Sequence, residues 1–434
     1  MFKKAVLIAV LMVALSAGYG FAAQVDSLAS SVGPAAPTQV FVNPGGLGDA
    51  LIYGYYNVRG RDTFFTVTNT DTVNGARVRI RFREADTISS ICNGSQELLD
   101  FDICLTPGDM WSGMITTDSA GAGRLFSNDK DTYVVVSPAP APAVIFPTAY
   151  PNGAQFKFGS LNPQAGITAD MTREGYFEII AERGLTEVTS GGNCGPNLTD
   201  NPLTDVGNVL MGHLYMVDTA SSETFGYAAT ALGDFSIVPL SGAGVDIGSP
   251  QPNFRDNSED ATIVPVNYAL TKSELTSVYD LQADVAGATQ LVVTFPTKLY
   301  THSCASADDI FDDPRVKIIV YDDAENSPTS TCEFSPCPTG TDVSLPDEVN
   351  VIDINSSAVF SSTVTTEIST PFSFGWIDVN LVDTNTTAPS PLHQTQFNGG
   401  LTSLGLPALG YAAHSFVGGN VSGMIPMQYK SNIQ

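Results

Sequence analysis

The chain has 434 residues and a formal net charge of −26, from 19 lysines and arginines against 45 aspartates and glutamates. Nucleic-acid binding requires clustered cations that contact phosphates, so this charge excludes a general nucleic-acid-binding protein. Hydrophobic residues make up 43% of the chain, which is enough for a packed core and excludes a disordered protein. The low charged fraction, 15%, and the 39 glycines and 27 prolines indicate a chain with many turns.

Residues 1–22 have the features of a secretory signal peptide. Lys3 and Lys4 precede an apolar run from Ala5 to Leu15, and small residues follow up to Ala22. No later stretch approaches the roughly 18 uninterrupted apolar residues that cross a bilayer, so we expect no transmembrane segment in the mature chain. The sequence therefore predicts a secreted protein.

Strand-like alternation of polar and apolar residues recurs from residue 39 to the end of the chain. A linker rich in alanine, serine and proline covers residues 23–38, and a second linker, dense in glycine, proline, serine and asparagine, covers residues 246–260. We therefore predict an all-β protein with two tandem antiparallel β-sandwich domains, Ig-like or jelly-roll-like, at residues 39–245 and 261–434.

The strand-like segments of the two predicted domains match in order, which predicts a tandem duplication. In the first domain the segments are Thr63–Thr68, Arg77–Glu84, Leu98–Leu105, Gly212–Asp218 and Gly226–Leu232. In the second they are Thr289–Phe295, Arg315–Asp322, Glu348–Ile354, Gly375–Leu381 and Gly410–Phe416.

One predicted strand carries an unusual stripe of cations. Its outward positions are occupied by Arg77, Arg79, Arg81 and Arg83, whereas the alternate positions are apolar. Asp100 and Asp102 alternate in the same way on a later strand. The simplest interpretation is a solvated sheet face with cross-strand ion pairs, each worth tenths of a kcal/mol. The alternative is an interface at which the arginine stripe docks an acidic surface of a neighbouring copy.

We find no sequence signature of an enzyme. The nucleophile elbow, the zinc-protease motif and the phosphate-binding loop are absent. The histidines, His213, His302, His393 and His414, are dispersed, and we expect structural roles for them. The many acidic residues make carboxylate pairing uninformative about glycoside hydrolysis. We therefore predict a non-catalytic protein without a cofactor.

The calcium-binding potential of one loop depends on its carboxylates. Asp308, Asp309, Asp312 and Asp313 crowd a single segment, and clustered oxygen ligands in extracellular loops bind Ca²⁺ weakly. The EF-hand spacing is missing, so solvated loop acids are the simpler interpretation. These aspartates remain the candidate metal ligands.

The six cysteines of an exported chain favour disulfides over free thiols. Cys92 and Cys104 flank one predicted strand, and we expect them to pair. The partners of Cys194, Cys304, Cys332 and Cys337 stay open, because Cys304 could close onto Cys332 as well as Cys332 onto Cys337. The absence of paired Cys-x-x-Cys spacings excludes a typical structural zinc site.

Aromatic residues offer a second kind of candidate site. Trp111 and Trp376, together with Tyr53, Tyr55 and Tyr56, could form a platform on which sugars stack. Tryptophan within a strand is more often part of the core. A binding module for glycans or for a surface protein is therefore the alternative function.

Three stretches resemble a group of secreted proteobacterial proteins that are usually left uncharacterised. They are Phe41–Tyr53, Phe101–Trp111 and Val293–Lys298. The resemblance implies an extracellular or cell-surface protein of a Gram-negative bacterium, and it transfers no catalytic residue. We expect a structural protein of the cell surface or extracellular matrix, whose partners are further copies of itself or cell-surface components.

Overall fold

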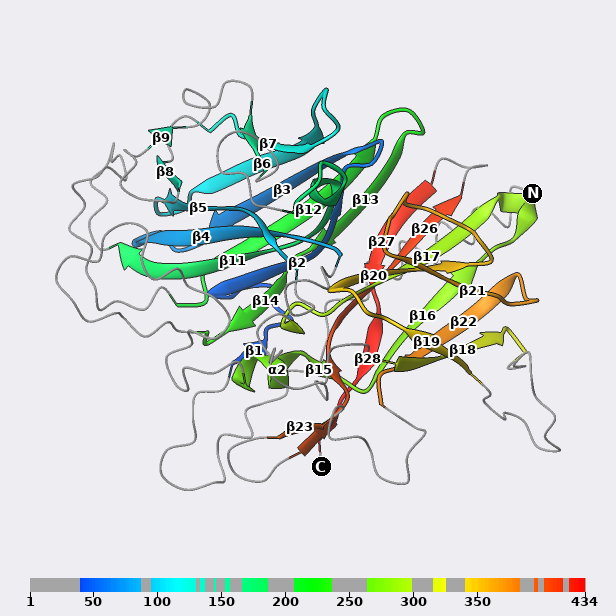
Figure 1. Ribbon diagram of the computed structural model, residues 1–434. Coiled ribbons are helices and arrows are strands. Elements are labelled where there is room, and N and C mark those ends of the chain that lie inside the picture. The colour runs from blue at the N-terminus through cyan, green and yellow to red at the C-terminus, as the bar shows by residue number, and fades with distance from the viewer. Residues whose placement is uncertain are drawn as a thin grey trace.

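The computed structural model describes most of the chain between residues 40 and 433. The described residues are 40–86, 95–129, 133–136, 144–145, 153–156, 166–185, 207–235, 264–298, 315–324, 340–382, 394–396, 402–416 and 421–433. The predicted signal peptide and both predicted linkers lie outside these ranges. The described part is nearly all β, with several antiparallel sheets, as predicted (Figure 1). None of its helices is long and apolar enough to cross a membrane.

The N-terminal sheet pair consists of an eight-stranded sheet I and a six-stranded sheet II. Sheet I has the strand order β1-β14-β2-β11-β4-β5-β8-β9, and sheet II has the order β10-β7-β6-β3-β12-β13. Their bounds are β1 Phe41–Val42, β2 Ala50–Asn57, β3 Asp62–Asn69, β4 Gly75–Glu84, β5 Glu97–Leu105, β6 Met110–Thr117, β7 Gly123–Phe126, β8 Tyr133–Val136, β9 Val144–Ile145, β10 Ala154–Gln155, β11 Glu174–Leu185, β12 Leu210–Asp218, β13 Glu223–Ala228 and β14 Thr230–Gly233. The 3₁₀ helix η3, Asp170–Arg173, precedes β11.

The C-terminal sheet pair consists of two five-stranded sheets. Sheet III has the order β19-β18-β22-β16-β28, and sheet IV has the order β21-β20-β17-β26-β27. Their bounds are β16 Glu274–Asp280, β17 Gly287–Thr294, β18 Arg315–Asp322, β19 Thr341–Ser344, β20 Val349–Ile354, β21 Thr365–Ile368, β22 Phe374–Asn380, β26 Leu409–Phe416, β27 Val421–Pro426 and β28 Gln428–Lys430. Small elements complete the described chain: α2 Val264–Leu270, η4 Ala283–Val285, β15 Thr271–Lys272, β23 Gln394–Gln396, β24 Thr402–Leu404, β25 Leu406–Pro407 and β29 Asn432–Ile433.

The two sheet pairs have the same topology. In sheet I the order β14-β2-β11-β4-β5 corresponds, strand by strand and in chain order, to β28-β16-β22-β18-β19 in sheet III. In sheet II the order β7-β6-β3-β12-β13 corresponds in the same way to β21-β20-β17-β26-β27 in sheet IV. One difference is that β20 pairs with β21 in parallel, whereas β6 and β7 are antiparallel. Because ten strands recur in one chain order and one spatial order, this topology supports the predicted duplication.

The strand-by-strand alignment predicted from the sequence is only partly right. The pairs β3 with β17 and β4 with β18 are correct. The sequence matched Leu98–Leu105 with Glu348–Ile354. The first segment lies in β5, whose counterpart is β19, but the second lies in β20, whose counterpart is β6. The match of Gly212–Asp218 with Gly375–Leu381 is also wrong. The first segment lies in β12, whose counterpart is β26, and the second lies in β22, whose counterpart is β11. Period-two alternation is common to all half-buried strands, so it does not distinguish one neighbour from the next.

Two glycines mark the duplication at the residue level. Gly175 on β11 lies opposite Glu84, and Gly375 on β22 lies opposite Asp322. A Cβ on either glycine would lie 1.9 Å from a backbone carbonyl oxygen, that of Arg83 or of Tyr321. The equivalent contact explains why the second residue of both strands is a glycine.

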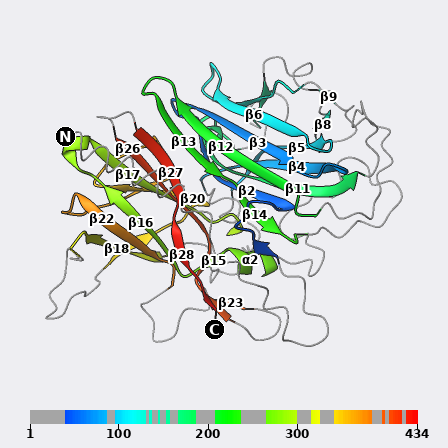
Figure 2. The same ribbon diagram turned by 180° about the vertical axis from the view of Figure 1, so that it is seen from behind.

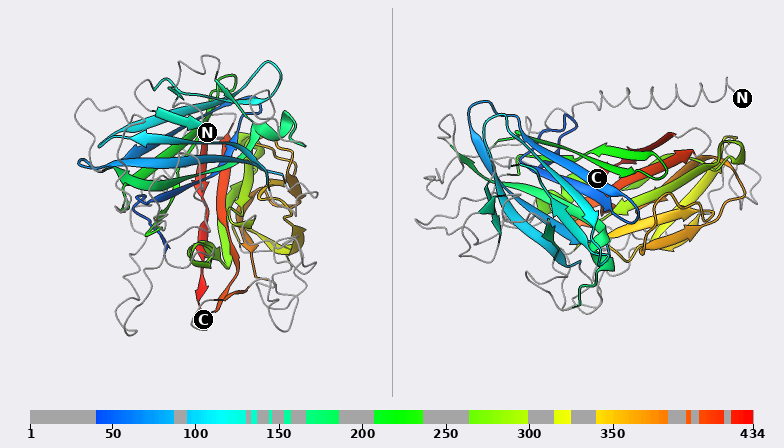
Figure 3. Two further views of the ribbon diagram at one scale, coloured as in Figure 1. Left: turned by 60° about the vertical axis from the view of Figure 1, so that its left-hand side comes forward. Right: turned by 90° about the horizontal axis from the view of Figure 1, so that it is seen from above.

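Alternating side chains of sheets I and II form the N-terminal core. Phe65 on β3 lies 4.7 Å from Phe177 on β11 and 5.5 Å from Trp111 on β6, measured between ring centroids. Tyr53 stacks on Phe177 at 4.2 Å. A second hydrophobic cluster, which includes Leu291 and Ile377, lies between sheets III and IV. The two sheet pairs lie side by side, with sheet IV turned towards the N-terminal pair (Figures 2 and 3).

Candidate functional site

The arginine stripe is largely buried, with only Arg77 partly exposed, and it is already paired within the chain. Arg77 and Arg79 each contact Asp102 at 2.6 Å, and Arg79 also pairs with Asp100. Arg81 contacts Glu178 at 2.7 Å. The side chain of Arg79 is 2% exposed.

This geometry confirms that arginines face carboxylates across the sheet, but it corrects both predictions about the stripe. The stripe of Arg77, Arg79, Arg81 and Arg83 is neither a solvated face nor an exposed surface for a neighbouring copy. Sequence alternation shows which side chains share a face, but it does not show whether that face is covered. Ionised groups placed out of water need such matched partners, because an unpaired buried charge costs several kcal/mol.

The predicted aromatic platform is divided between core and surface. Tyr53, Tyr55, Tyr56 and Trp111 are fully buried, as core residues are. Trp376 is 37% exposed and stacks on Tyr321, with ring centroids 4.1 Å apart and planes inclined by 9°. Only Trp376 of the five predicted aromatics therefore reaches the surface.

The two histidines in the described residues differ in their surroundings. His414 on β26 is buried against Thr289, whose Oγ1 lies 3.1 Å from Nδ1, and burial lowers the pKa of His414 to about 4. It is therefore neutral at neutral pH. His213 on β12 is half-buried on the outer face of sheet II. His302 and His393 lie outside the described residues.

The metal and disulfide predictions fall mostly outside the described residues. Asp308, Asp309, Asp312 and Asp313 lie there, as do Cys92, Cys194, Cys304, Cys332 and Cys337. Cys104, on β5, is not a free thiol. The ranges that the structure describes contain no group of three or more acidic, histidine or cysteine side chains placed to hold a metal ion.

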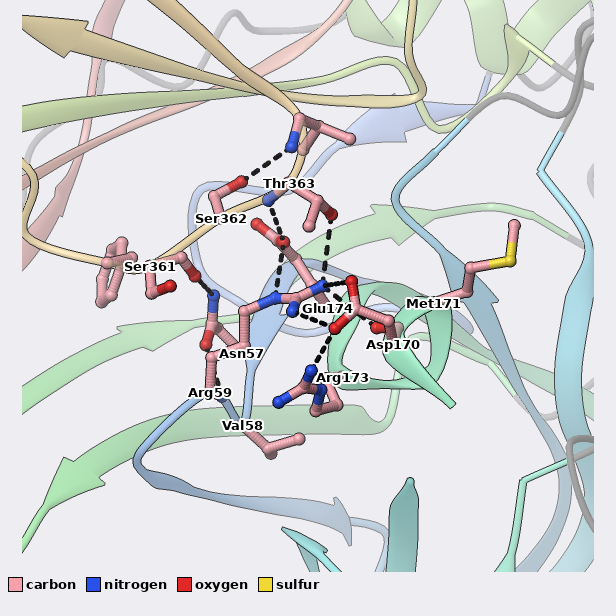
Figure 4. A network of polar contacts seen from close by, with 12 residues as sticks. Asn57, Val58, Arg59, Asp170, Met171, Arg173, Glu174, Ser361, Ser362 and Thr363 are labelled. Atoms are coloured by element: carbon pink, nitrogen blue, oxygen red, sulfur yellow. Dashed lines mark hydrogen bonds and ion pairs between the residues drawn. The ribbon is translucent and has the colours of Figure 1, made fainter. Parts of the chain in front are cut away.

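A polar network joins the two sheet pairs (Figure 4). Arg59, after β2, forms ion pairs with Asp170 of η3 and with Glu174 of β11, the latter at 3.3 Å. Its Nη2 also donates to Oγ1 of Thr363 at 3.2 Å, and the backbone N–H of Thr363 donates to Glu174 at 3.2 Å. Burial raises the pKa of Glu174, and Arg59 opposes that rise. The segment between β20 and β21 is thereby held against sheet I.

A second network, which is buried, also joins the sheet pairs. Glu348 accepts hydrogen bonds from the backbone N–H of Ser95 at 3.1 Å and from the hydroxyl of Tyr176 at 2.6 Å. Glu84 lies close to it, and burial, with Asp86 and Glu348 as neighbouring charges, raises the pKa of Glu84 to about 8. The junction therefore contains a carboxyl group that is protonated at neutral pH.

The apolar part of the junction is formed by the outer face of sheet IV, which we call the covered face. Three rows of residues from β20, β17 and β26 make it up: Asp353–Gln290–Ala413, Val351–Val292–Tyr411 and Val349–Thr294–Leu409. Most of these side chains belong to the same hydrophobic cluster as the N-terminal core. Tyr411 lies 4.6 Å from Tyr227, and Thr294 donates to the carbonyl of Gly54 at 2.6 Å. The two sheet pairs therefore share one core.

The counterpart of the covered face in sheet II is exposed, and we call it the open face. Its rows, from β6, β3 and β12, are Met114–Phe64–Tyr215, Ser112–Thr66–His213 and Met110–Thr68–Met211. Phe64, Met110, Met211 and Tyr215 are between 36% and 55% exposed. These rows contain no aspartate, glutamate, lysine or arginine. Exposed apolar patches of this kind mark interaction sites.

A third surface lies on sheet III. It corresponds to the part of sheet I that packs against the C-terminal sheet pair. In sheet I this part includes Tyr55, whose ring lies 5.3 Å from that of Phe360, and Tyr176, which contacts Glu348. Two equivalent residue pairs align sheet I with sheet III. Tyr56 lies opposite Gly175 across β2 and β11, and Tyr279 lies opposite Gly375 across β16 and β22. The corresponding outward side chains of sheet III are Val278 and Trp376, with Tyr321 beside them. We call these three residues the receiving row.

Sequence reasoning missed the open face. The one available signal was the adjacent pair Phe64–Phe65, which places large apolar side chains on both faces of β3 and departs from strict alternation. The exposed methionines gave no signal, because methionine is equally common in cores.

Comparisons with known proteins add little. No family model matches the chain, and no curated protein matches it. Among solved structures, the apo form of a lectin from Pleurotus ostreatus aligns with 93% of this chain and 85% of its own, at 10% identity. The TM-score of 0.10 is too low for that alignment to carry an argument about fold or function.

Proposed function

We propose that this protein is a non-catalytic secreted structural protein of the cell surface or extracellular matrix, built from two tandem β-sandwich domains at residues 39–245 and 261–434. The observation that carries the proposal is the junction. One hydrophobic cluster, one partly exposed polar network and one buried polar network span the sheet pairs, so the pairs are expected to move as one rigid body. A rigid unit of this kind suits a load-bearing or space-filling role better than a hinge-closing enzyme.

The extracellular location is part of the same proposal. A signal peptide at residues 1–22 and a disulfide between Cys92 and Cys104 would both belong to an exported protein. The experiment is antibody labelling of intact producing cells, combined with fractionation of the medium and the envelope. Labelling at the surface or in the matrix, and altered matrix cohesion in a deletion strain, are the expected results. Retention in the cytoplasm would contradict the proposal.

Binding of glycans is a second candidate, favoured by the half-exposed Trp376 and its stacking on Tyr321. Flat aromatic rings stack on the apolar faces of sugars. A glycan array probed with the wild-type chain and with Trp376→Ala tests it. Signals that the variant loses would favour this candidate, and an array without signals would oppose it.

A further inference from the structure

The covered face and the open face are equivalent surfaces of the repeated topology, but among the residues that the structure describes only the covered face has a partner. In the C-terminal pair, the covered face packs on β2 of sheet I, where Thr294 donates to the carbonyl of Gly54 and the ring of Tyr411 lies beside Gly54. The flanking residues Phe360 and Glu348 contact Tyr55 and Tyr176 of the same sheet. In the N-terminal pair, the open face has no such cover, because Met110 is 55% exposed and Tyr215 is 45% exposed. The described part of the chain thus contains one complete docking of this type and one face without a cover.

The surface that would complete a second docking is also present, and no described segment covers it. In sheet III, Val278 and Trp376 occupy the positions that Tyr55 and Tyr176 occupy in sheet I. Both are exposed, Val278 at 45%. The two faces lie on different sheet pairs and are the two halves of one docking geometry. Six of the ten large hydrophobic side chains that are exposed in the described residues belong to these two surfaces.

We propose that the open face of one copy docks onto the receiving row of the next copy, in the way that the covered face docks onto sheet I within the chain. This inference rests on the proposed structural function and names the partner as a second copy. The contact is heterologous, since two different surfaces meet, so each bound copy leaves one surface of each kind free. A heterologous contact that does not close into a ring produces an open chain.

The chemistry of the open face favours a protein partner of this kind. Aromatic and methionine side chains are enriched in protein interfaces, whereas charged residues are depleted at their centres. Copies that carry a net charge of −26 repel one another, so they can approach closely only through uncharged rows such as Met114–Phe64–Tyr215.

The contact is expected to be weaker than the intramolecular one. The segment between β20 and β21, which supplies Phe360, spans residues 355–364, whereas its counterpart between β6 and β7 spans only residues 118–122. The open face therefore lacks a counterpart of Phe360, the residue that packs beside Tyr55. Assembly should depend on concentration, and it needs to be measured with concentrated protein.

Two variants and one control test the inference. Tyr215→Glu places a charge on the open face, and Val278→Glu places one on the receiving row. Val73→Glu is the matched control, because Val73 is 75% exposed and belongs to neither surface. Trp376→Ala is a second receiving-row variant, in case Val278→Glu unfolds, and circular dichroism verifies each fold. Sedimentation velocity and negative-stain electron microscopy measure assembly of the mature chain.

The expected results differ between single variants and their mixture. Wild type and Val73→Glu should form chains that lengthen with concentration, whereas each surface variant alone should stay monomeric, with an apparent Kd raised about tenfold or more. An equimolar mixture of the two variants should stop at a dimer, because each supplies the surface that the other lacks. Assembly unaffected by Val278→Glu or Trp376→Ala, a mixture that stays monomeric, or a wild type that is monomeric at every concentration would overturn the inference. A monomeric wild type would leave the cell-surface location to be decided by the labelling experiment.

Discussion

Truncating Phe360 is expected to uncouple the two sheet pairs. The side chain is 1% exposed and lies between Tyr55, at 5.3 Å, and Phe225, at 4.8 Å, with the guanidinium of Arg61 4.6 Å from its ring centroid. Its backbone N–H and carbonyl are both hydrogen-bonded to the side chain of Gln290. Because Gln290 holds the segment in place, the backbone cannot collapse into the space that Phe360→Ala leaves. A loss of about 3 to 5 kcal/mol is therefore expected, the range for buried phenylalanine.

The chain contains its own reporters for this experiment. Trp111 lies in the N-terminal core and Trp376 lies on sheet III, and they are the only tryptophans. Urea unfolding followed by fluorescence in Trp111→Phe and Trp376→Phe backgrounds therefore reports on each sheet pair separately. The two transitions should coincide in the parent chains and separate after Phe360→Ala.

The matched control is Phe64→Ala on the open face. Phe64 is 40% exposed, and substitutions at such positions usually change stability by no more than about 0.5 kcal/mol. If Phe64→Ala destabilised the protein as much as Phe360→Ala, or if the two transitions stayed together after Phe360→Ala, the reasoning about the shared core would be refuted.

Three further predictions concern a carboxyl group, an ion pair and a glycine. The pKa of Glu84 is raised from 4.5 to about 8, so its stabilising contribution is complete below about pH 4.5 and is lost as the pH rises to about 8. Glu84→Gln should remove that loss, so its free energy of unfolding should exceed that of wild type by about 2 to 4 kcal/mol at pH 8 and equal it at pH 4.5. Urea titrations at both pH values measure the difference. Arg79→Leu should lower the free energy of unfolding by about 3 to 5 kcal/mol, because it leaves Asp100 buried without its partner. The double variant Arg79→Leu with Asp100→Leu should lose less, and a larger loss in the double variant would argue against a buried pair. Gly375→Ala should cost at least about 2 kcal/mol because its Cβ would overlap a carbonyl oxygen, while Gly423→Ala, with open space around it, should be neutral in thermal unfolding.

The all-β class and the recurrence of strands along the chain could be predicted from the sequence, because both depend on local patterns. Alternation in segments such as Arg77–Glu84 identifies a strand and the side chains that share a face. It does not identify the strand's neighbour in the sheet, which is why β5 was matched to β20. Partner choice depends on contacts distant in sequence, such as the pairing of β11 with both β2 and β4.

The candidate surfaces were harder to predict, because exposure is a property of the whole fold. Thr66 and Val292 occupy equivalent places on β3 and β17, yet one lies on the open face and the other in the shared core. Only the position of the neighbouring sheet pair distinguishes them. The arginine stripe presents the opposite case, in which strongly polar side chains such as Arg79 are buried.

The response of assembly to salt distinguishes the docking inferred here from the arginine-mediated docking that the sequence suggested. Ion pairing between copies would weaken as salt is added, because screening shortens the range of charge–charge attraction. Contact through Phe64, Tyr215 and Trp376 should instead strengthen, because salt reduces repulsion between copies and leaves the apolar contact intact. The Debye length falls from about 10 Å at 0.1 M to about 3 Å at 1 M. Light scattering in sodium chloride across that range should therefore show longer chains at high salt, and sodium chloride avoids occupying any calcium site. Dissolution of assemblies by salt would mean that charged groups, and not the open face, hold the copies together.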